Sequence, residues 1–151
     1  MNTNRIAVSL TVLLLAVAPS LYAARCSNAS LHGTYGYSSQ GFASVTPDIS
    51  PALFLPQAQT GLITFDGRGN HSGTYTLNST DPAGGVARGT FTGTYAVNSD
   101  CTATAEVLID VGGSLHVDTV VLSPTEFVSI STDAGNSIIY SGKKIGDPRE
   151  R

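Results

Sequence analysis

Hydrophobic and polar residues alternate along most of this chain, the pattern of strands that bury one of their two faces. Thr, Ser, Gly, Val and Tyr dominate the alternating segments, turn residues recur at short intervals, and helical periodicity is nearly absent. The pattern predicts eight strands, over residues 32–42, 58–65, 71–79, 87–98, 102–111, 114–123, 126–132 and 137–144.

The connections between the last seven of these strands are short: "DGRGN", "STDPAGGV", "SD", "GG", "PT" and "DAGN". Short connections join antiparallel neighbours, so the strands form a meander. A meander of eight strands removes its two exposed edges when the first strand pairs with the last. The sequence therefore predicts an all-β protein, an eight-stranded antiparallel up-and-down β-barrel, with a two-sheet β-sandwich as the alternative.

One phrase occurs three times, as "GTYTLNS" at 73–79, "GTYAVNS" at 93–99 and, more loosely, "GTYGYSS" at 33–39. Within such a strand the glycines and aromatic residues, for example Gly93 and Tyr95, fall on one face because strand side chains alternate. Glycine lets a strand coil tightly, and an aromatic side chain of a neighbouring strand can cover the bare backbone. We interpret the repeat as a way of building barrel strands, rather than as a binding motif.

The first 23 residues have the features of a secretory signal peptide. A short polar start with one positive charge precedes the apolar run "IAVSLTVLLLAVAP", and Ala23 supplies a small residue for cleavage. Arg25, directly before Cys26, argues against lipidation, because a lipoprotein signal requires a small residue there. We expect an exported protein, secreted or periplasmic, with one β-barrel domain over 24–145 and a flexible C-terminal tail over 146–151.

The charge and the cysteines exclude several classes of function. Removal of Arg5 with the signal leaves seven Lys and Arg against 11 Asp and Glu, and this acidic balance argues against nucleic-acid binding. No further apolar run is long enough to span a membrane. Cys26 and Cys101 are expected to pair in an oxidising compartment, since their separation lacks the close ligand spacing of metal sites. No metal or cofactor is predicted.

The segment "SVTPDISPALFLPQAQ" at 44–59 interrupts the strand rhythm. Prolines at 47, 51 and 56 argue against a regular central strand. The residues Leu53, Phe54 and Leu55 are too apolar to lie freely in water, so we expect the segment to fold over one end of the barrel. Two interpretations remain open: a plug that completes the core, or a lid over a ligand cavity.

The Gly112-Gly113 link defines a register if it is a two-residue turn, with Val111 opposite Ser114. In that register His116 and Asp118 point into the barrel, where an imidazole near a carboxylate is suited to acid–base chemistry. These two residues are the candidate catalytic groups, although such a pair also serves stability alone. Candidate lumen-lining aromatic residues are Tyr35, Tyr75, Phe91, Tyr95 and Tyr140, with Tyr37 beside them.

The blocks "CSNASLHGTYGYSSQG", "GLITFDGRGNHSGTY" and "GTYAVNSDCTAT" resemble the recurring blocks of a family of small secreted bacterial proteins. The resemblance extends from Cys26 to about Lys144 and includes both cysteines. It implies an exported bacterial protein and transfers no catalytic residues. In architecture alone, an eight-stranded barrel of this size resembles the allene-oxide-cyclase, dirigent and lipocalin-like barrels, although the lipocalin G-x-W signature is absent because the chain has no Trp.

These observations favour an exported binding or interaction module whose barrel holds one small apolar ligand. An alternative is an enzyme of the cyclase or isomerase type that uses His116 and Asp118 in the lumen. A third hypothesis is a structural, envelope-associated protein with a filled barrel.

Overall fold

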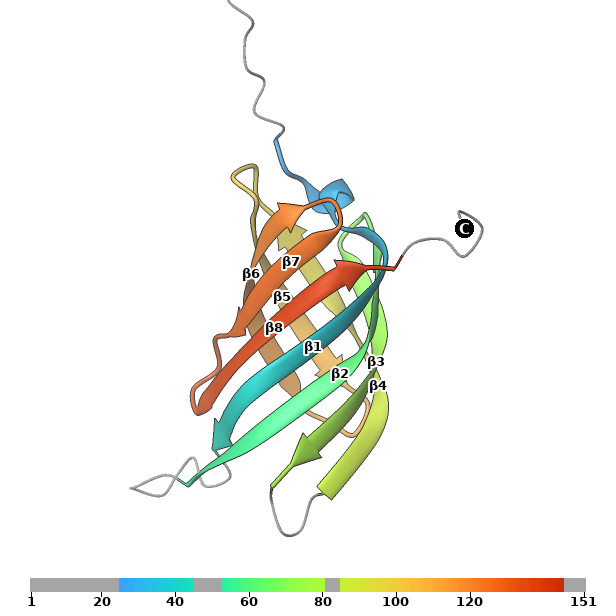
Figure 1. Ribbon diagram of the computed structural model, residues 1–151. Helices are drawn as coiled ribbons and strands as arrows, with labels where there is room; N and C mark the ends of the chain where they lie inside the picture. The colour runs from blue at the N-terminus through green and yellow to red at the C-terminus, as the bar shows by residue number, and fades with distance from the viewer. Residues whose placement is uncertain (1–24, 45–52, 81–84, 146–151) are drawn as a thin grey trace, which may run out of the picture.

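The computed structural model describes residues 25–44, 53–80 and 85–145, and the expected signal peptide (1–23) and C-terminal tail (146–151) lie outside this range. The described chain forms a closed barrel in which each strand pairs antiparallel with the next and β1 pairs with β8 (Figure 1). The predicted up-and-down barrel is confirmed, and the sandwich alternative is wrong. A short 3-10 helix, η1 (Asn28–Ser30), precedes strands β1 (His32–Ser44), β2 (Phe54–Asp66), β3 (Asn70–Ser79), β4 (Gly85–Val97), β5 (Thr102–Ile109), β6 (Ser114–Ser123), β7 (Glu126–Ser131) and β8 (Asn136–Lys144).

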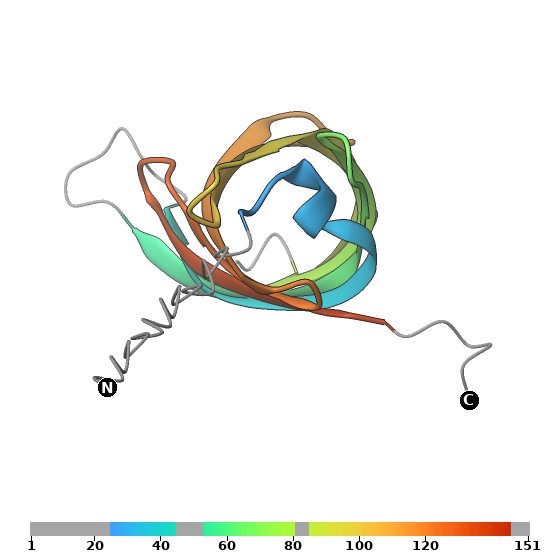
Figure 2. The ribbon, with the colours of Figure 1, turned by 90° about the horizontal axis from the view of Figure 1, so that it is seen from above.

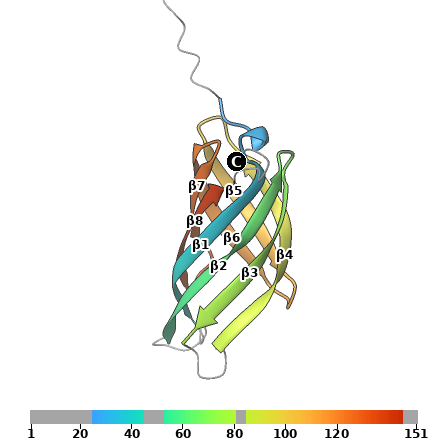
Figure 3. The same ribbon diagram turned by 45° about the vertical axis from the view of Figure 1, so that its right-hand side comes forward.

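Glycines on the inner face of the barrel lie under aromatic side chains from neighbouring strands. A Cβ on Gly93 would come within 2.7 Å of the His71 imidazole, and one on Gly89 within 2.6 Å of the Tyr75 hydroxyl. Phe91 covers Gly73 in the same way. The repeated phrase thus supplies bare backbone at Gly73 and Gly93, which rings outside the phrase cover, and a ring at Tyr75 that covers Gly89. Figure 3 shows β1 to β4 side by side on this part of the wall.

Strand β2 begins at Phe54, four residues before the predicted start, so the expectation that Phe54 and Leu55 fold over the barrel as a plug or lid is wrong. Phe54 is exposed on the outer face and Leu55 is half-buried on the inner face, while Leu53 is exposed just before the strand. Pro56 fits because its carbonyl points toward the β3 side, where it accepts the Thr80 N–H beyond the last β2–β3 pair. Its missing N–H faces the same side, so no hydrogen bond between β1 and β2 is lost. Residues 45–52 lie outside the described range.

The N-terminal segment closes one end of the barrel. Viewed along the axis, η1 lies over the opening (Figure 2). Leu31, which is 2% exposed, packs into the core, and its carbonyl accepts the Tyr95 hydroxyl at 2.9 Å. The Asn28 side chain accepts the Val97 N–H at 2.8 Å. These contacts tie the segment to β4 through buried or half-buried hydrogen bonds.

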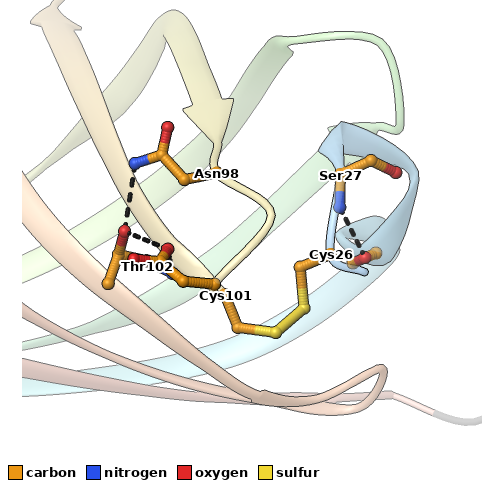
Figure 4. Close-up of a disulfide and its surroundings, with 7 residues drawn as sticks. Cys26, Ser27, Asn98, Cys101 and Thr102 are labelled. Carbon is orange, nitrogen blue, oxygen red and sulfur yellow. Dashed lines mark hydrogen bonds between the residues drawn. A yellow bond between two sulfur atoms is a disulfide. The ribbon is translucent and has the colours of Figure 1, made fainter. Parts of the chain in front are cut away.

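The predicted disulfide between Cys26 and Cys101 is confirmed, and it joins the same N-terminal segment to the β4–β5 turn (Figure 4). In that turn the Asp100 carboxylate accepts the Thr102 N–H at 3.0 Å and the Thr102 hydroxyl at 2.7 Å. Cys101 has a left-handed φ of 70°, an uncommon conformation for a residue other than glycine. The closed end is therefore held covalently as well as by packing.

Aromatic rings fill the barrel directly beneath η1. The Phe65 ring lies at the centre of the group and packs edge-to-face against Tyr35 (5.5 Å between centroids), Tyr95 (5.1 Å) and Phe127 (5.7 Å). Tyr35 is fully buried and donates its hydroxyl to the Pro124 carbonyl at 2.8 Å. Edge-to-face contacts of this kind stabilise beyond the apolar area that they bury. This layer of packed rings fills the closed end of the barrel.

The outer face is rich in Thr and Ser, and its exposed apolar side chains include neighbours on β6 to β8, where Val120 is opposite Val128 and Ile130 is opposite Ile139. None of the helices in the part of the chain that the structure describes is long and apolar enough to cross a membrane.

Candidate functional site

A cavity of about 270 Å³ occupies the barrel below the aromatic layer. At roughly 30 Å³ for each water molecule in the liquid, this volume equals that of about nine waters. Most of the side chains that line it are apolar and come from the inner faces of β2 to β6. The apolar lining includes Ile63, Leu77, Phe91, Val107 and Ile109. An eight-stranded barrel of this kind is wide enough either to be filled by side chains or to hold one small ligand.

The cavity extends to the end of the barrel opposite η1. Leu77 and Ala87 line it beside the β3–β4 connection, and Ile109, Val111 and Leu115 line it at the β5–β6 connection. Val111 is 81% exposed, so the lining continues from the interior to the surface of the molecule. Among the described residues, η1 and the aromatic layer close the other end, and the cavity lining reaches the surface at this end.

Four of the five residues predicted to line the lumen do so: Tyr75, Phe91, Tyr95 and Tyr140 contribute to the cavity wall. Tyr35 also points inward, but it is completely buried in the aromatic layer and does not line the cavity. The alternation of side chains along each strand was sufficient to predict these residues. Each lies on the same face of its strand as glycines of the repeated phrase or as buried residues.

The predicted inward orientation of His116 and Asp118 is wrong. Both residues are exposed on the outer face of β6, whereas Leu115, Val117 and Thr119 point into the barrel. The observed pairs place Leu108, instead of Val111, opposite Ser114. This is a shift of three positions relative to a two-residue turn, and an odd shift moves every side chain of a strand to the opposite face.

Asp110 provides the physical reason for the longer connection. Its carboxylate accepts the Thr90 N–H at 2.6 Å and the Thr90 hydroxyl at 3.1 Å, and the Tyr75 hydroxyl lies 3.3 Å away. The hydrogen bond from the Thr90 backbone is the main cause that holds the pKa of Asp110 below its usual value. These contacts bind Asp110 to β4 beyond the end of β5, and Gly112 and Gly113, both with positive φ, then reverse the chain.

On the outer face His116 pairs with Asp133 instead of Asp118. Its Nδ1 lies 2.8 Å from the Asp133 carboxylate, which also accepts the His116 backbone N–H at 2.7 Å. The hydrogen bond to Asp133 raises the pKa of His116 above 6.5. Its Nε2 lies 4.0 Å from Glu106, and the imidazole is 53% exposed. The arrangement is a surface ion pair with no access to the lumen.

The histidine that does face the cavity is His71, which was not predicted from the sequence. It is 5% exposed and its ring packs among Phe65, Phe91 and Tyr95, with centroids 5.9 to 6.4 Å away. Its Nε2 lies 3.1 Å from the Glu106 carbonyl, while the buried Nδ1 has no hydrogen-bond partner among the described residues. Burial lowers the pKa of His71 below 6.5, so the imidazole is neutral near pH 7.

A signal for His71 was present in the sequence. His71 is two residues before Gly73 and four before Tyr75, so its side chain lies on the same face of the strand as these two inward-facing residues of the repeated phrase.

The cavity wall carries no formal charge near neutral pH. Among the described residues that line it there is no Asp, Glu, Lys or Arg, and its imidazole is neutral. No group of three or more His, Cys, Asp or Glu residues suited to a metal ion occurs in the described ranges. A charged molecule entering the lumen would lose its hydration without gaining a counter-ion, which is costly. The geometry suits an uncharged ligand.

Comparisons with known proteins extend the likeness only to the fold. No protein-family model matches the chain, and no curated protein matches its sequence. Among solved structures, the barrel is similar to one described as a "De novo design of a fluorescence-activating beta barrel", with a TM-score of 0.50 and 16% sequence identity. The match covers 76% of this chain and 93% of that chain. At this identity the similarity supports the β-barrel architecture and does not transfer a ligand.

Proposed function

We propose that this protein is an exported binding module that holds one small, uncharged and mainly apolar molecule in the lumen of its barrel. The observation that carries the proposal is the cavity of about 270 Å³, which is lined mostly by apolar side chains and free of formal charge. Binding sites for small molecules are typically concave and apolar with a few polar groups that fix orientation. This cavity has the same character, at the small end of the size range.

Export is part of the same proposal. It is supported by the disulfide between Cys26 and Cys101, because such bonds persist in oxidising compartments outside the cytosol. It is also supported by the apolar run near the N-terminus and by the resemblance to small secreted bacterial proteins. A periplasmic or extracellular carrier of a poorly soluble compound fits these features.

The alternatives receive less support. The cyclase or isomerase hypothesis relied on an inward pair of His116 and Asp118, and both residues lie on the outer face. The hypothesis of a filled structural barrel does not account for the cavity.

The proposal is tested by titrating the mature protein with naphthalene, an uncharged two-ring probe whose own fluorescence reports its transfer into an apolar site. Ala105 is half-buried and lines the cavity, so Ala105→Leu fills part of it. Ala96 is exposed on the outer face of the neighbouring strand, so Ala96→Leu adds the same atoms outside the barrel. We expect saturable binding to the wild type, at least tenfold weaker binding to Ala105→Leu, and no change with Ala96→Leu.

Two results would overturn the proposed function. One is the absence of saturable binding to the wild type, which would indicate that the cavity does not accept a ring compound. The other is equal weakening by both variants, which would place the probe elsewhere on the protein.

A further inference from the structure

A row of polar side chains crosses the inner wall of the barrel. The register places Ser39 on β1 opposite both Gln59 on β2 and Tyr140 on β8. Tyr140 is in turn opposite Ser129 on β7, and Ser129 is opposite Thr119 on β6. Five consecutive strands therefore contribute one polar residue each to a continuous row, which we call the polar rung: Gln59, Ser39, Tyr140, Ser129 and Thr119.

The remaining three strands continue the same row with apolar residues. Gln59 is opposite Leu77 on β3, which is opposite Ala87 on β4, and Thr119 is opposite Ala103 on β5. Because the strands are tilted, the row winds around the barrel from Ala87 at the end opposite η1 to Ala103 beside the closed end, and its polar members lie on β1, β2 and β6 to β8 between them. A ligand that matches this wall has a polar group on one edge and an apolar body.

Most members of the polar rung that line the cavity are already hydrogen-bonded. The Thr119 and Ser129 hydroxyls lie 2.7 Å apart and satisfy each other. The Gln59 side-chain amide donates to the Tyr37 hydroxyl at 2.6 Å, and that hydroxyl lies 3.3 Å from the Thr74 carbonyl. These contacts are internal to the wall and leave the positions of the side chains well defined.

Tyr140 differs from these neighbours. Its side chain lines the cavity and is half-buried, yet its hydroxyl makes no hydrogen bond with any of the described residues. Burial, with a smaller contribution from the nearby Tyr37, raises the pKa of Tyr140, so the phenol is protonated across the physiological range. A protonated phenol both donates and accepts a hydrogen bond. Removing such a group from bulk water without providing a partner is unfavourable.

We propose that the Tyr140 hydroxyl is the polar anchor of the lumen, and that the ligand is an uncharged compound of one or two fused rings with a single hydrogen-bonding oxygen. This inference rests on the proposed function and specifies its ligand. The apolar body of the ligand packs against β3 to β5, and its oxygen meets Tyr140 in the middle of the polar rung. The volume of about 270 Å³ sets the size, and the uncharged lining excludes carboxylates.

Three probes with one two-ring skeleton test the anchor: naphthalene, 2-naphthol and 2-naphthoate, titrated at pH 7 by calorimetry. They differ only in lacking an oxygen, carrying an uncharged hydroxyl, or carrying a charge. We expect 2-naphthol to bind at least fivefold more tightly than naphthalene, and 2-naphthoate to bind far more weakly than either. In Tyr140→Phe, which removes the hydroxyl and keeps the ring, the preference for 2-naphthol should disappear and the affinity for naphthalene should remain.

Tyr35→Phe is the matched control. Tyr35 points into the barrel but does not line the cavity, and its hydroxyl donates to the Pro124 carbonyl at 2.8 Å, so its removal should leave the preference for 2-naphthol intact. If 2-naphthol and naphthalene bind equally, or Tyr140→Phe keeps the preference, the anchor is refuted while the binding function stands. Tight binding of 2-naphthoate would refute the inference that the uncharged lumen excludes charged ligands. If none of the three probes binds, the proposed function itself fails.

Discussion

The disulfide between Cys26 and Cys101 is expected to supply a large part of the stability of this barrel. Replacing both cysteines with alanine removes the bond and leaves the hydrogen bonds of the N-terminal segment in place, including the 2.9 Å contact between Tyr95 and the Leu31 carbonyl. The double variant therefore tests the covalent link separately from the packing at the closed end.

The magnitude follows from the loop that the bond closes. The two cysteines are 75 positions apart, and a cross-link over such a loop lowers the entropy of the unfolded chain by about 15 cal/mol/K in the chain-entropy model. At 25 °C this corresponds to about 4.5 kcal/mol. Domains of this size have about 5–15 kcal/mol of total stability, so the variant is expected to retain its fold with a much smaller margin.

Urea unfolding followed by far-UV circular dichroism measures this loss. With a denaturant slope of roughly 1–3 kcal/mol per molar for a small domain, the midpoint should fall by about 1.5–4.5 M. Wild-type protein with the bond reduced by phosphine is the control, since it has the same loop without any substitution and should match the variant. A loss below about 1 kcal/mol, with an unchanged slope, would refute the loop-entropy reasoning.

Two further predictions concern Gly93 on the inner wall and the titration of the two histidines, His71 and His116. A Cβ on Gly93 would collide with the Glu106 carbonyl and with the His71 ring, so Gly93→Ala should lower the free energy of unfolding by about 3 kcal/mol. Thr94→Ala, on the exposed face of the same strand, should lower it by less than ~1 kcal/mol. Equal losses of the two variants in urea unfolding would refute the close approach of the backbone at Gly93. Because the pKa of His71 is lowered on folding, the unfolded chain binds the extra proton, and His71 should reduce stability as the pH falls below about 6.5. The raised pKa of His116, on the outer face, acts in the opposite sense: it adds stability below about pH 6.5 that is lost as the pH rises. NMR titration of the two imidazoles should show His71 titrating below about pH 6.5 and His116 above it. The reverse order would refute the environments assigned to the two histidines.

Local patterns in the sequence were sufficient for the strands, the disulfide and most of the cavity wall. Alternation placed Tyr75, Phe91, Tyr95 and Tyr140 on inner faces, because strand side chains alternate regardless of where the strand lies in the sheet. Short connections made the neighbours antiparallel, and the need to remove exposed edges predicted closure of the barrel. These inferences depend only on neighbouring residues or on general rules for sheets.

The register between strands depended on contacts that local patterns do not contain. The faces of β6 were decided by the hydrogen bonds of Asp110 to Thr90, two residues 20 positions apart, which lengthen the β5–β6 connection and turn His116 outward. The same register aligns Gln59 with Tyr140 through Ser39 and so creates the polar rung. Because one residue of slip reverses an entire strand, the orientation of β6 was decided only when the tertiary structure fixed its pairing with β5.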